Sequence, residues 1–235
     1  MRVLAIDTSS SALGAAIVDE GGVAAEFGLA SGRQHSEVLL PLLESLLAAV
    51  KLELTDMAAL AVTIGPGSFT GLRIGLATVK AWAQVLALPV IPVSTLEALA
   101  YTAAEHGQLI CPVLNARRGE LYAALFEDGQ RLWADMAVAP AELAARLAEY
   151  ARPVIFCGDG LNSEAQILRA VLGGNMREAP PPRRLFMAAA AGVLGREKLL
   201  AGETADAAAL EPAYLRLSEA EEKRLAKQHG DQPHD

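Results

Sequence analysis

The chain has 235 residues, 52% hydrophobic and 20% charged, so it can bury a full core as one large domain or two small ones. Its 28 acidic against 20 basic residues give a formal net charge of −8, which argues against autonomous binding to a nucleic-acid backbone. The two cysteines form no CxxC motif and no apolar stretch reaches membrane-spanning length, so we expect a cytoplasmic protein with two buried thiols.

The first half of the chain predicts a three-stranded meander followed by alternating helices and strands. Alternating or continuous apolar runs indicate the strands, and apolar residues at helical spacing indicate the helices. The resulting order, β-β-β-α-β-α-β, is typical of an RNase H-like half with a mixed sheet and crossover helices. The expected strands are 3–6, 13–18, 23–29, 60–64 and 90–93, and the expected helices are 36–50 and 72–87.

The second half repeats this order of elements, although no residue-level repeat is evident. We therefore expect two domains, 1–104 and 105–217. Residues 218–235 are rich in charged and polar side chains, and we expect a solvated helix there that gives way to a disordered tail. The expected strands are 109–114, 120–126, 131–138 and 154–157, and the expected helices are 140–150, 164–172 and 185–200.

A turn with four glycines and a proline, Gly65–Gly75, joins the strand 60–64 to the helix that follows it. Glycine permits positive φ and close approach of another backbone, so the turn suits either an anion or a packed neighbouring segment. A helix cap by Ser68 or Thr70 is the simpler alternative. The segment has neither the Gly-Lys-Ser/Thr of a phosphate-binding loop nor the glycine spacing of a nucleophile elbow, so Ser68 has no local case as a nucleophile.

Several segments, taken together and in chain order, resemble the bacterial TsaB (YeaZ) family of tRNA threonylcarbamoyladenosine biosynthesis. The resemblance is dense over roughly the first 125 residues and continues in outline to residue 216. The segments are Leu4–Ser9, His35–Glu37 leading into Leu39–Pro41, Gly65–Gly75, Val93–Leu96, Asn115–Tyr122, Gly158–Gly160 and Pro212–Arg216.

This resemblance implies a fold, a role and a set of partners. The fold is α/β, with two tandem RNase H-like domains on the plan of the actin, sugar kinase and heat-shock chaperone superfamily. The partner is the paralogous TsaD transferase, which moves a threonylcarbamoyl group from an adenylate to the adenosine beside the tRNA anticodon. The resemblance also implies that the ATPase TsaE completes the assembly and that tRNA binds to the complex rather than to this chain directly. When TsaD is absent, the chain is expected to form a homodimer. No membrane association is implied.

The metal-binding histidines of the transferase have no counterpart here. Laying its Val-Asn-His-x-x-x-His stretch on residues 93–99 places Thr95 and Leu99 where the two histidines fall, and leucine cannot ligate a metal. The four histidines of the chain do not supply a substitute: His35 precedes a helix, His106 is isolated, and His229 and His234 lie in the tail. We therefore expect a non-catalytic subunit without a metal site, and nothing supports a peptidase.

A weak nucleotide or phosphate site stays open as an alternative. Its residues follow two buried strands, where members of the superfamily that use ATP hold the metal-phosphate group: Asp7, Thr8, Ser9, Gly158, Asp159 and Gly160. The competing function is an ATP-dependent transferase that uses its own interdomain cleft. The simpler interpretation is that Asp7 is a turn carboxylate, so that no cofactor is required and weak ATP or ADP binding belongs to the complex.

The basic motif also leaves two interpretations open. It begins with Asn115, where the family usually has Asp, which makes an ion-binding or catalytic role for that position doubtful. Arg117 and Arg118 contact a partner or RNA, or they are simply exposed in a tight turn between strands.

The two helices of the first half are apolar on more than the side that a sheet needs. Small residues with one large aromatic suit a close helix-helix contact, and we expect a partner interface there. The alternative is that both helices are covered within their own domain. The expected interface residues are Val38, Leu42, Leu46, Gly71, Gly75, Thr78 and Trp82.

Overall fold

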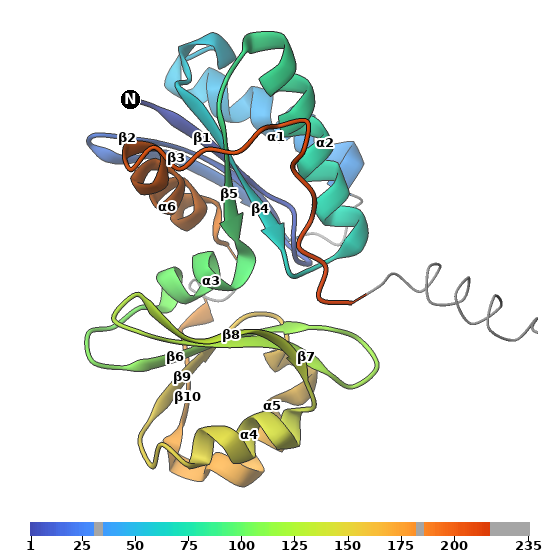
Figure 1. The fold of residues 1–235 in the computed structure, drawn as a ribbon, viewed down its shortest axis with the longest axis vertical. Coiled ribbons are helices and arrows are strands. Elements are labelled where there is room, and N and C mark those ends of the chain that lie inside the picture. Colours follow the sequence, from blue (N-terminus) through green and yellow to red (C-terminus); the bar gives the residue numbers. More distant parts are fainter. Residues whose placement is uncertain (31–34, 182–185, 217–235) are drawn as a thin grey trace, which may run out of the picture.

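The computed structural model describes residues 1–30, 35–181 and 186–216, which form two five-stranded mixed sheets joined by a helix (Figure 1). The first sheet has the strand order β3-β2-β1-β4-β5, with β1 antiparallel to β2 and parallel to β4. Its elements are β1 (Val3–Asp7), β2 (Leu13–Asp19), β3 (Gly22–Leu29), α1 (His35–Val50), the 3-10 turn η1 (Leu54–Asp56), β4 (Ala59–Gly65), α2 (Phe69–Leu86) and β5 (Val90–Ser94).

Alternating side chains of the first sheet build two apolar layers, because successive residues of a strand point to opposite faces. Leu4 and Ile6 of β1 belong to the cluster that contains the buried residues of α1 and α2. Val3 and Ala5 of the same strand belong instead to the cluster that contains Ala190 and Ala191 of α6 (Ala188–Leu200). The central strands are therefore covered on both faces.

The second sheet repeats the topology of the first, with the order β10-β9-β6-β7-β8. Helices α4 and α5 contribute Leu143, Leu147 and Leu168 to an apolar cluster with the strands on one of its faces. Its elements are β6 (Leu109–Asn115), β7 (Leu121–Glu127), β8 (Gln130–Val138), α4 (Pro140–Ala148), β9 (Val154–Cys157), α5 (Leu161–Leu172), η2 (Gly173–Asn175) and β10 (Met176–Glu178).

Helix α3 (Thr95–Ala103) lies between the two sheets and shares one buried cluster with both (Figure 1). Leu96 and Leu99 of this helix belong to a cluster that also contains Ile91 of the first sheet and Phe126 of the second. The two halves therefore share a continuous apolar core.

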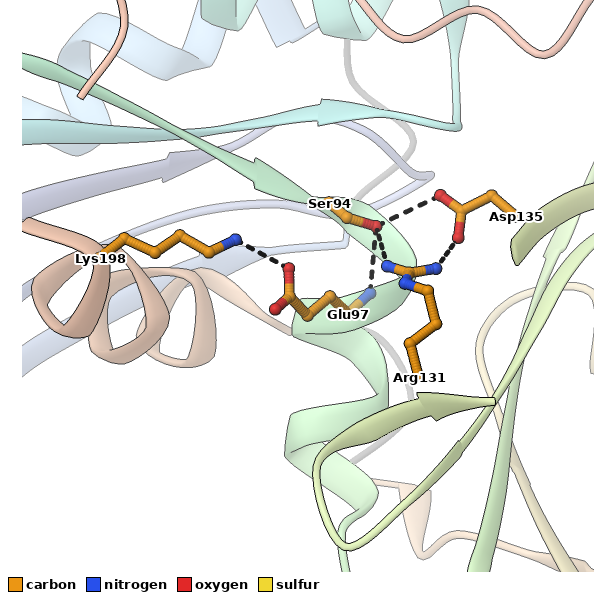
Figure 2. A network of polar contacts seen from close by, with 5 residues as sticks. All are labelled: Ser94, Glu97, Arg131, Asp135 and Lys198. Carbon is orange, nitrogen blue, oxygen red and sulfur yellow. Dashed lines mark hydrogen bonds and ion pairs between the residues drawn. The ribbon is translucent and has the colours of Figure 1, made fainter. Parts of the chain in front are cut away.

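A polar network reinforces the same junction (Figure 2). Ser94 caps α3 by accepting a hydrogen bond from the amide of Glu97, and its hydroxyl also accepts one from Arg131 of β8 at 3.1 Å. Arg131 pairs with Asp135 on the same strand. Lys198 of α6 pairs with the Glu97 carboxylate at 2.9 Å, so β8, α3 and α6 are tied together.

The chain returns to its first half after β10. Helix α6 packs so closely on the first sheet that a Cβ on Gly195 would lie 2.6 Å from the Cβ of Ala61. The extended segment 203–216, which we call the C-terminal strap, then pairs with the free edge of β5, where the Ala205 amide donates to the Val90 carbonyl at 2.8 Å. Figure 1 shows it in red beside β5 and α2.

The predicted strands are confirmed to within one or two residues, and the helix predictions differ mainly at their ends. Helix α3 and strand β10 were missed, as were the short 3-10 turns η1 and η2. Although it falls within the expected second domain, 105–217, helix α6 packs on strands of the first sheet, and the strap pairs with β5 of that sheet. The expected helix and tail at 218–235 lie outside the described residues.

Candidate functional site

The glycine-rich turn brings the start of α2 against the turn that follows β1. The Ser68 amide donates to the Ser9 carbonyl at 2.7 Å, and the Thr8 hydroxyl donates to the Gly71 carbonyl at 2.7 Å. Ser68 is also the helix cap, since its hydroxyl accepts from the Gly71 amide. The turn therefore receives another backbone segment, which was one of the two uses expected for it.

Three glycines spaced four residues apart make this contact possible. A Cβ on Gly67 would overlap the Ser9 carbonyl, a Cβ on Gly71 would overlap the Thr8 carbonyl, and one on Gly75 would overlap the Thr8 hydroxyl. Gly71 and Gly75 thus face the interior of their own domain. They were expected at a partner interface, but both are buried against the turn after β1.

The other expected interface residues divide between the core and the surface. Leu46 is fully buried and packs toward the sheet with the rest of the α1 core, so it too belongs to the interior. Val38, Leu42, Thr78 and Trp82 are half-buried.

More exposed apolar side chains lie on the same two helices. Leu40 of α1 is 50% exposed and Val85 of α2 is 81% exposed. Neither side chain was among the interface residues expected from the sequence. The sequence indicates Val85 only as an apolar residue outside the helix side that the buried residues form.

Asp7 is buried at the end of β1, and its carboxylate is used within the turn. One oxygen, Oδ1, accepts from the Ser9 amide at 3.1 Å, the Ser9 hydroxyl at 2.6 Å and the Thr63 hydroxyl at 2.7 Å. Burial raises the pKa of Asp7, and the hydrogen bonds from Ser9 and Thr63 oppose that rise. This geometry is the turn-carboxylate arrangement expected as the simpler interpretation.

Asp159 and its flanking glycines also make local contacts. The Asp159 carboxylate accepts from the Asn115 amide at 3.0 Å, and the Asn115 side chain in turn accepts from the Arg117 amide at 2.7 Å. Cβ atoms on Gly158 and Gly160 would crowd the carbonyl of Val113 on the neighbouring strand. Of the expected phosphate-site residues, only Ser9 and Asp159 line the cleft described next.

A cleft of about 550 Å³ lies between the two halves. Five segments line it: the turn after β1, the first turn of α2 with the residues before it, the β6–β7 loop with the adjoining strand ends, the turn after β9, and the end of the C-terminal strap. The residues are Ser9, Ser10, Ser11, Gly67, Ser68, Phe69, Thr70, Leu114, Asn115, Ala116, Arg117, Arg118, Tyr122, Asp159, Tyr214 and Arg216.

The strap is held at this cleft by aromatic and ionic contacts. The Tyr214 ring stacks on Phe69 with centroids 4.8 Å apart, and its hydroxyl accepts from Arg73 at 3.0 Å. Arg216 pairs with Glu120 at the end of the β6–β7 loop, so the strap joins the two halves. Sequence reasoning noted this stretch only as part of the Pro212–Arg216 motif and assigned it no role in a site.

The remaining candidate residues have local partners or lie in the core. His35 contacts the Ser10 carbonyl through Nε2 at 2.9 Å, while Thr95 and Leu99 are buried in α3. Within residues 1–30, 35–181 and 186–216, no three His, Cys, Asp or Glu side chains gather in a way that could hold a metal ion. The helices in those ranges also include none that is long and apolar enough to cross a membrane.

Comparison with known proteins identifies relatives over nearly the full chain. The family model described as TsaD, tRNA N6-adenosine threonylcarbamoyltransferase, matches residues 16–224. The tRNA threonylcarbamoyladenosine biosynthesis protein TsaB of Bacillus subtilis (strain 168) is 36% identical over 238 residues, which cover 97% of this chain and 100% of that protein.

Solved structures of other proteins resemble this chain as well. The structure of YeaZ from Pseudomonas aeruginosa superposes with a TM-score of 0.71 at 26% identity, covering 91% of this chain and 99% of that one. Component A of (R)-2-hydroxyglutaryl-CoA dehydratase from Acidaminococcus fermentans shares the fold alone, with a TM-score of 0.52 at 13% identity, covering 85% and 99% of the two chains. The expected α/β fold with two mixed sheets flanked by helices is thereby confirmed.

Proposed function

The chain belongs to the TsaB family of tRNA threonylcarbamoyladenosine biosynthesis proteins, and we propose that it is a non-catalytic subunit that pairs with and stabilises the TsaD transferase. In this role it serves the threonylcarbamoylation of the adenosine beside the tRNA anticodon without carrying reacting groups of its own. TsaE and tRNA join the complex that the pair forms.

The observation that carries this proposal is the apolar surface of α1 and α2. Leu40 and Val85 are exposed, and half-buried Leu42 and Trp82 belong to the same two helices. Large apolar side chains on one surface are typical of a protein-protein contact, with an aromatic residue as an anchor. We call these residues, with Val38 and Thr78, the α1–α2 surface.

A paralogue is a suitable occupant for this surface. The chain matches the TsaD family model over most of its length, so a TsaD protein is expected to present equivalent helices. Two related folds can then pair through like surfaces around an approximate twofold axis, as identical subunits do. The same reasoning makes a second copy of this chain the competing occupant when TsaD is absent.

The alternative, a transferase acting through its own cleft, has weaker support. Such an enzyme needs carboxylates available for a metal-phosphate group. The Asp7 Oδ1 oxygen already accepts three internal hydrogen bonds, and the Asp159 carboxylate holds the Asn115 amide.

The test is pairing with TsaD by variants of the α1–α2 surface. Val85→Glu places a charge on a side chain that is 81% exposed, so the fold of the chain alone should tolerate it. An interface that buries this side chain against TsaD should not tolerate an unpaired charge. Val171→Glu on α5, where the valine is 48% exposed, is the matched control. We expect Val85→Glu to weaken the Kd for TsaD at least tenfold and Val171→Glu to leave it unchanged.

The same variants should affect self-association in parallel, because the two partners compete for one surface. Sedimentation of the chain alone should show fewer dimers for Val85→Glu than for Val171→Glu. Equal TsaD affinity for the wild-type chain, Val85→Glu and a Leu40→Glu/Val85→Glu double variant would refute the proposal.

A further inference from the structure

The C-terminal strap lies along one side of helix α2 (Figure 1). The Tyr214 ring stacks on Phe69, and Arg73 lies over the same Phe69 ring, with its Cζ 3.9 Å from the centroid. Further along the helix, the Lys80 ammonium donates to the Ala208 carbonyl at 3.2 Å. The three α2 residues are four and seven positions apart, so they lie on one side of the helix. The strap follows this side for about three turns.

The strap is a built neighbour of α2. Leu210 is buried in the apolar cluster that contains the buried residues of α1 and α2. The Ala213 amide donates to the Ile64 carbonyl at 2.7 Å. At the end of the strap, Arg216 pairs with Glu120 of the second half. The attachment of the strap to α2 therefore rests on other residues than its attachment to the second half, and each can be removed separately.

Beside the strap, α2 carries an open apolar stripe. Its members, spaced three or four residues apart, are Ile74, Ala77, Ala81 and Val85. Val85 is 81% exposed, the two alanines are exposed, and Ile74 is half-buried. Ile74 directly follows Arg73 of the strap side, and one residue turns an α-helix by about 100°. The stripe therefore adjoins the strap side and continues the α1–α2 surface, to which Val85 belongs.

Helix α1 lies on the other side of α2 from the strap. It packs on β2 and β3, whereas the strap pairs with β5, at the opposite edge of the same sheet. An α-helix with its side chains is about 10–12 Å across, which is wider than one row of side chains. A partner helix that covers Val85 and Ala81 therefore reaches α1 on one side and the strap on the other.

The strap has apolar side chains to offer such a partner. Leu215 is 38% exposed, and Tyr214 is 36% exposed even though its ring stacks on Phe69. Tyrosine is enriched at protein interfaces because its ring is apolar and its hydroxyl finds a polar partner. The exposed apolar surface of α1 and α2 thus extends onto the strap.

We propose that the strap forms one flank of the surface on which TsaD pairs, with a TsaD helix seated on the stripe between α1 and the strap. The occupant follows from continuity, because the stripe includes Val85 of the α1–α2 surface. Pairing and attachment of the strap to α2 then strengthen each other by the same factor, as linked equilibria require. This inference rests on the proposed function and adds to it a coupling between TsaD and the end of the chain.

The first test is amide hydrogen exchange of the full chain, alone and with saturating TsaD. The Ala205 and Ala213 amides report on the strap, because they donate to the Val90 and Ile64 carbonyls. We expect TsaD to slow their exchange at least fivefold. Peptides from α5, which packs in the other half of the chain, should exchange equally in both samples.

The second test compares the TsaD affinity of two strap variants. Tyr214→Ala removes the ring on Phe69 and the acceptor for Arg73, so it loosens the strap from α2. Arg216→Ala is the matched control, because it removes the pair with Glu120 and leaves the contacts with α2. We expect Tyr214→Ala to weaken the Kd for TsaD at least fivefold and Arg216→Ala to change it by less than twofold. Circular dichroism checks the fold of both variants.

The outcomes separate this inference from the proposed function. If Val85→Glu weakens pairing but TsaD gives the strap amides no protection, or Tyr214→Ala binds TsaD as tightly as wild type, this inference alone is wrong. If Val85→Glu binds TsaD as tightly as wild type, the proposed function fails and this inference fails with it. Protection that appears on self-association but not with TsaD assigns the flank to a second copy of this chain, and likewise overturns the inference.

Discussion

Replacing Gly71 with alanine should destabilise the protein even though alanine is the better helix former. In an open helix position this change would stabilise by about 1 kcal/mol. Here the added Cβ would overlap the Thr8 carbonyl, a backbone atom that cannot rotate away. Overpacking of this kind costs about 1–3 kcal/mol, and displacement of Thr8 also weakens its hydroxyl bond to the Gly71 carbonyl, worth about 1 kcal/mol.

The net effect for Gly71→Ala is a loss of about 1–3 kcal/mol in the free energy of unfolding. For a chain of this size that corresponds to a fall in Tm of roughly 2–12 °C. Urea denaturation at a fixed chain concentration measures it, since self-association would otherwise contribute.

Gly75→Ala is the matched comparison, because its Cβ meets the Thr8 hydroxyl, which can rotate. Its helix gain and the lost hydroxyl bond nearly cancel, so its net effect should stay within about 1 kcal/mol. In a Thr8→Ala background, Gly75→Ala should become stabilising while Gly71→Ala stays destabilising. Unchanged stability of Gly71→Ala would show that α2 does not approach the β1 turn as described.

Two other predictions concern Asp7 and the strap. Burial raises the pKa of Asp7 above its ordinary value of 3.8, so the stability that its neutral form contributes is fully present below pH 3.8 and is lost as the pH rises through the raised pKa. Asp7→Asn keeps an oxygen that can accept from Ser9 and Thr63. Urea melts should therefore show the free energy of unfolding of this variant rising relative to that of the wild type as the pH rises above 3.8. A difference between the two proteins that is constant across pH would contradict this. Tyr214→Ala removes the ring on Phe69 and the acceptor for Arg73, and should raise amide exchange in the strap without lowering Tm by more than about 4 °C; exchange equal to wild type would show that Tyr214 does not hold the strap.

The sequence predicted most strands because their signal is local. Runs such as 3–6 and 13–18 are apolar and are bounded by turn residues, and periodicity is enough to find them. Helix α3 was missed because it is short and mostly buried between two sheets, so its few polar residues form no clear amphipathic pattern. Strand β10 is only three residues long and pairs with one neighbour.

The site was less predictable because it depends on contacts between distant segments. Gly71 and Gly75 share a helix side, and small residues serve equally for a partner helix or for a neighbouring turn. Only the position of Thr8 decides between these uses. The return of the strap to Gly65, where a Cβ would lie 2.6 Å from the Ala213 carbonyl, has no periodic signal at all.

Reconstitution of tRNA threonylcarbamoylation tests the central claim most directly. The reaction contains TsaD, TsaE, the threonylcarbamoyl adenylate, ATP and an unmodified tRNA transcript, with and without this chain. We predict that the modified adenosine forms with the chain, falls to background without it, and does not form when the chain replaces TsaD. Modified adenosine produced by this chain in the absence of TsaD would contradict the account.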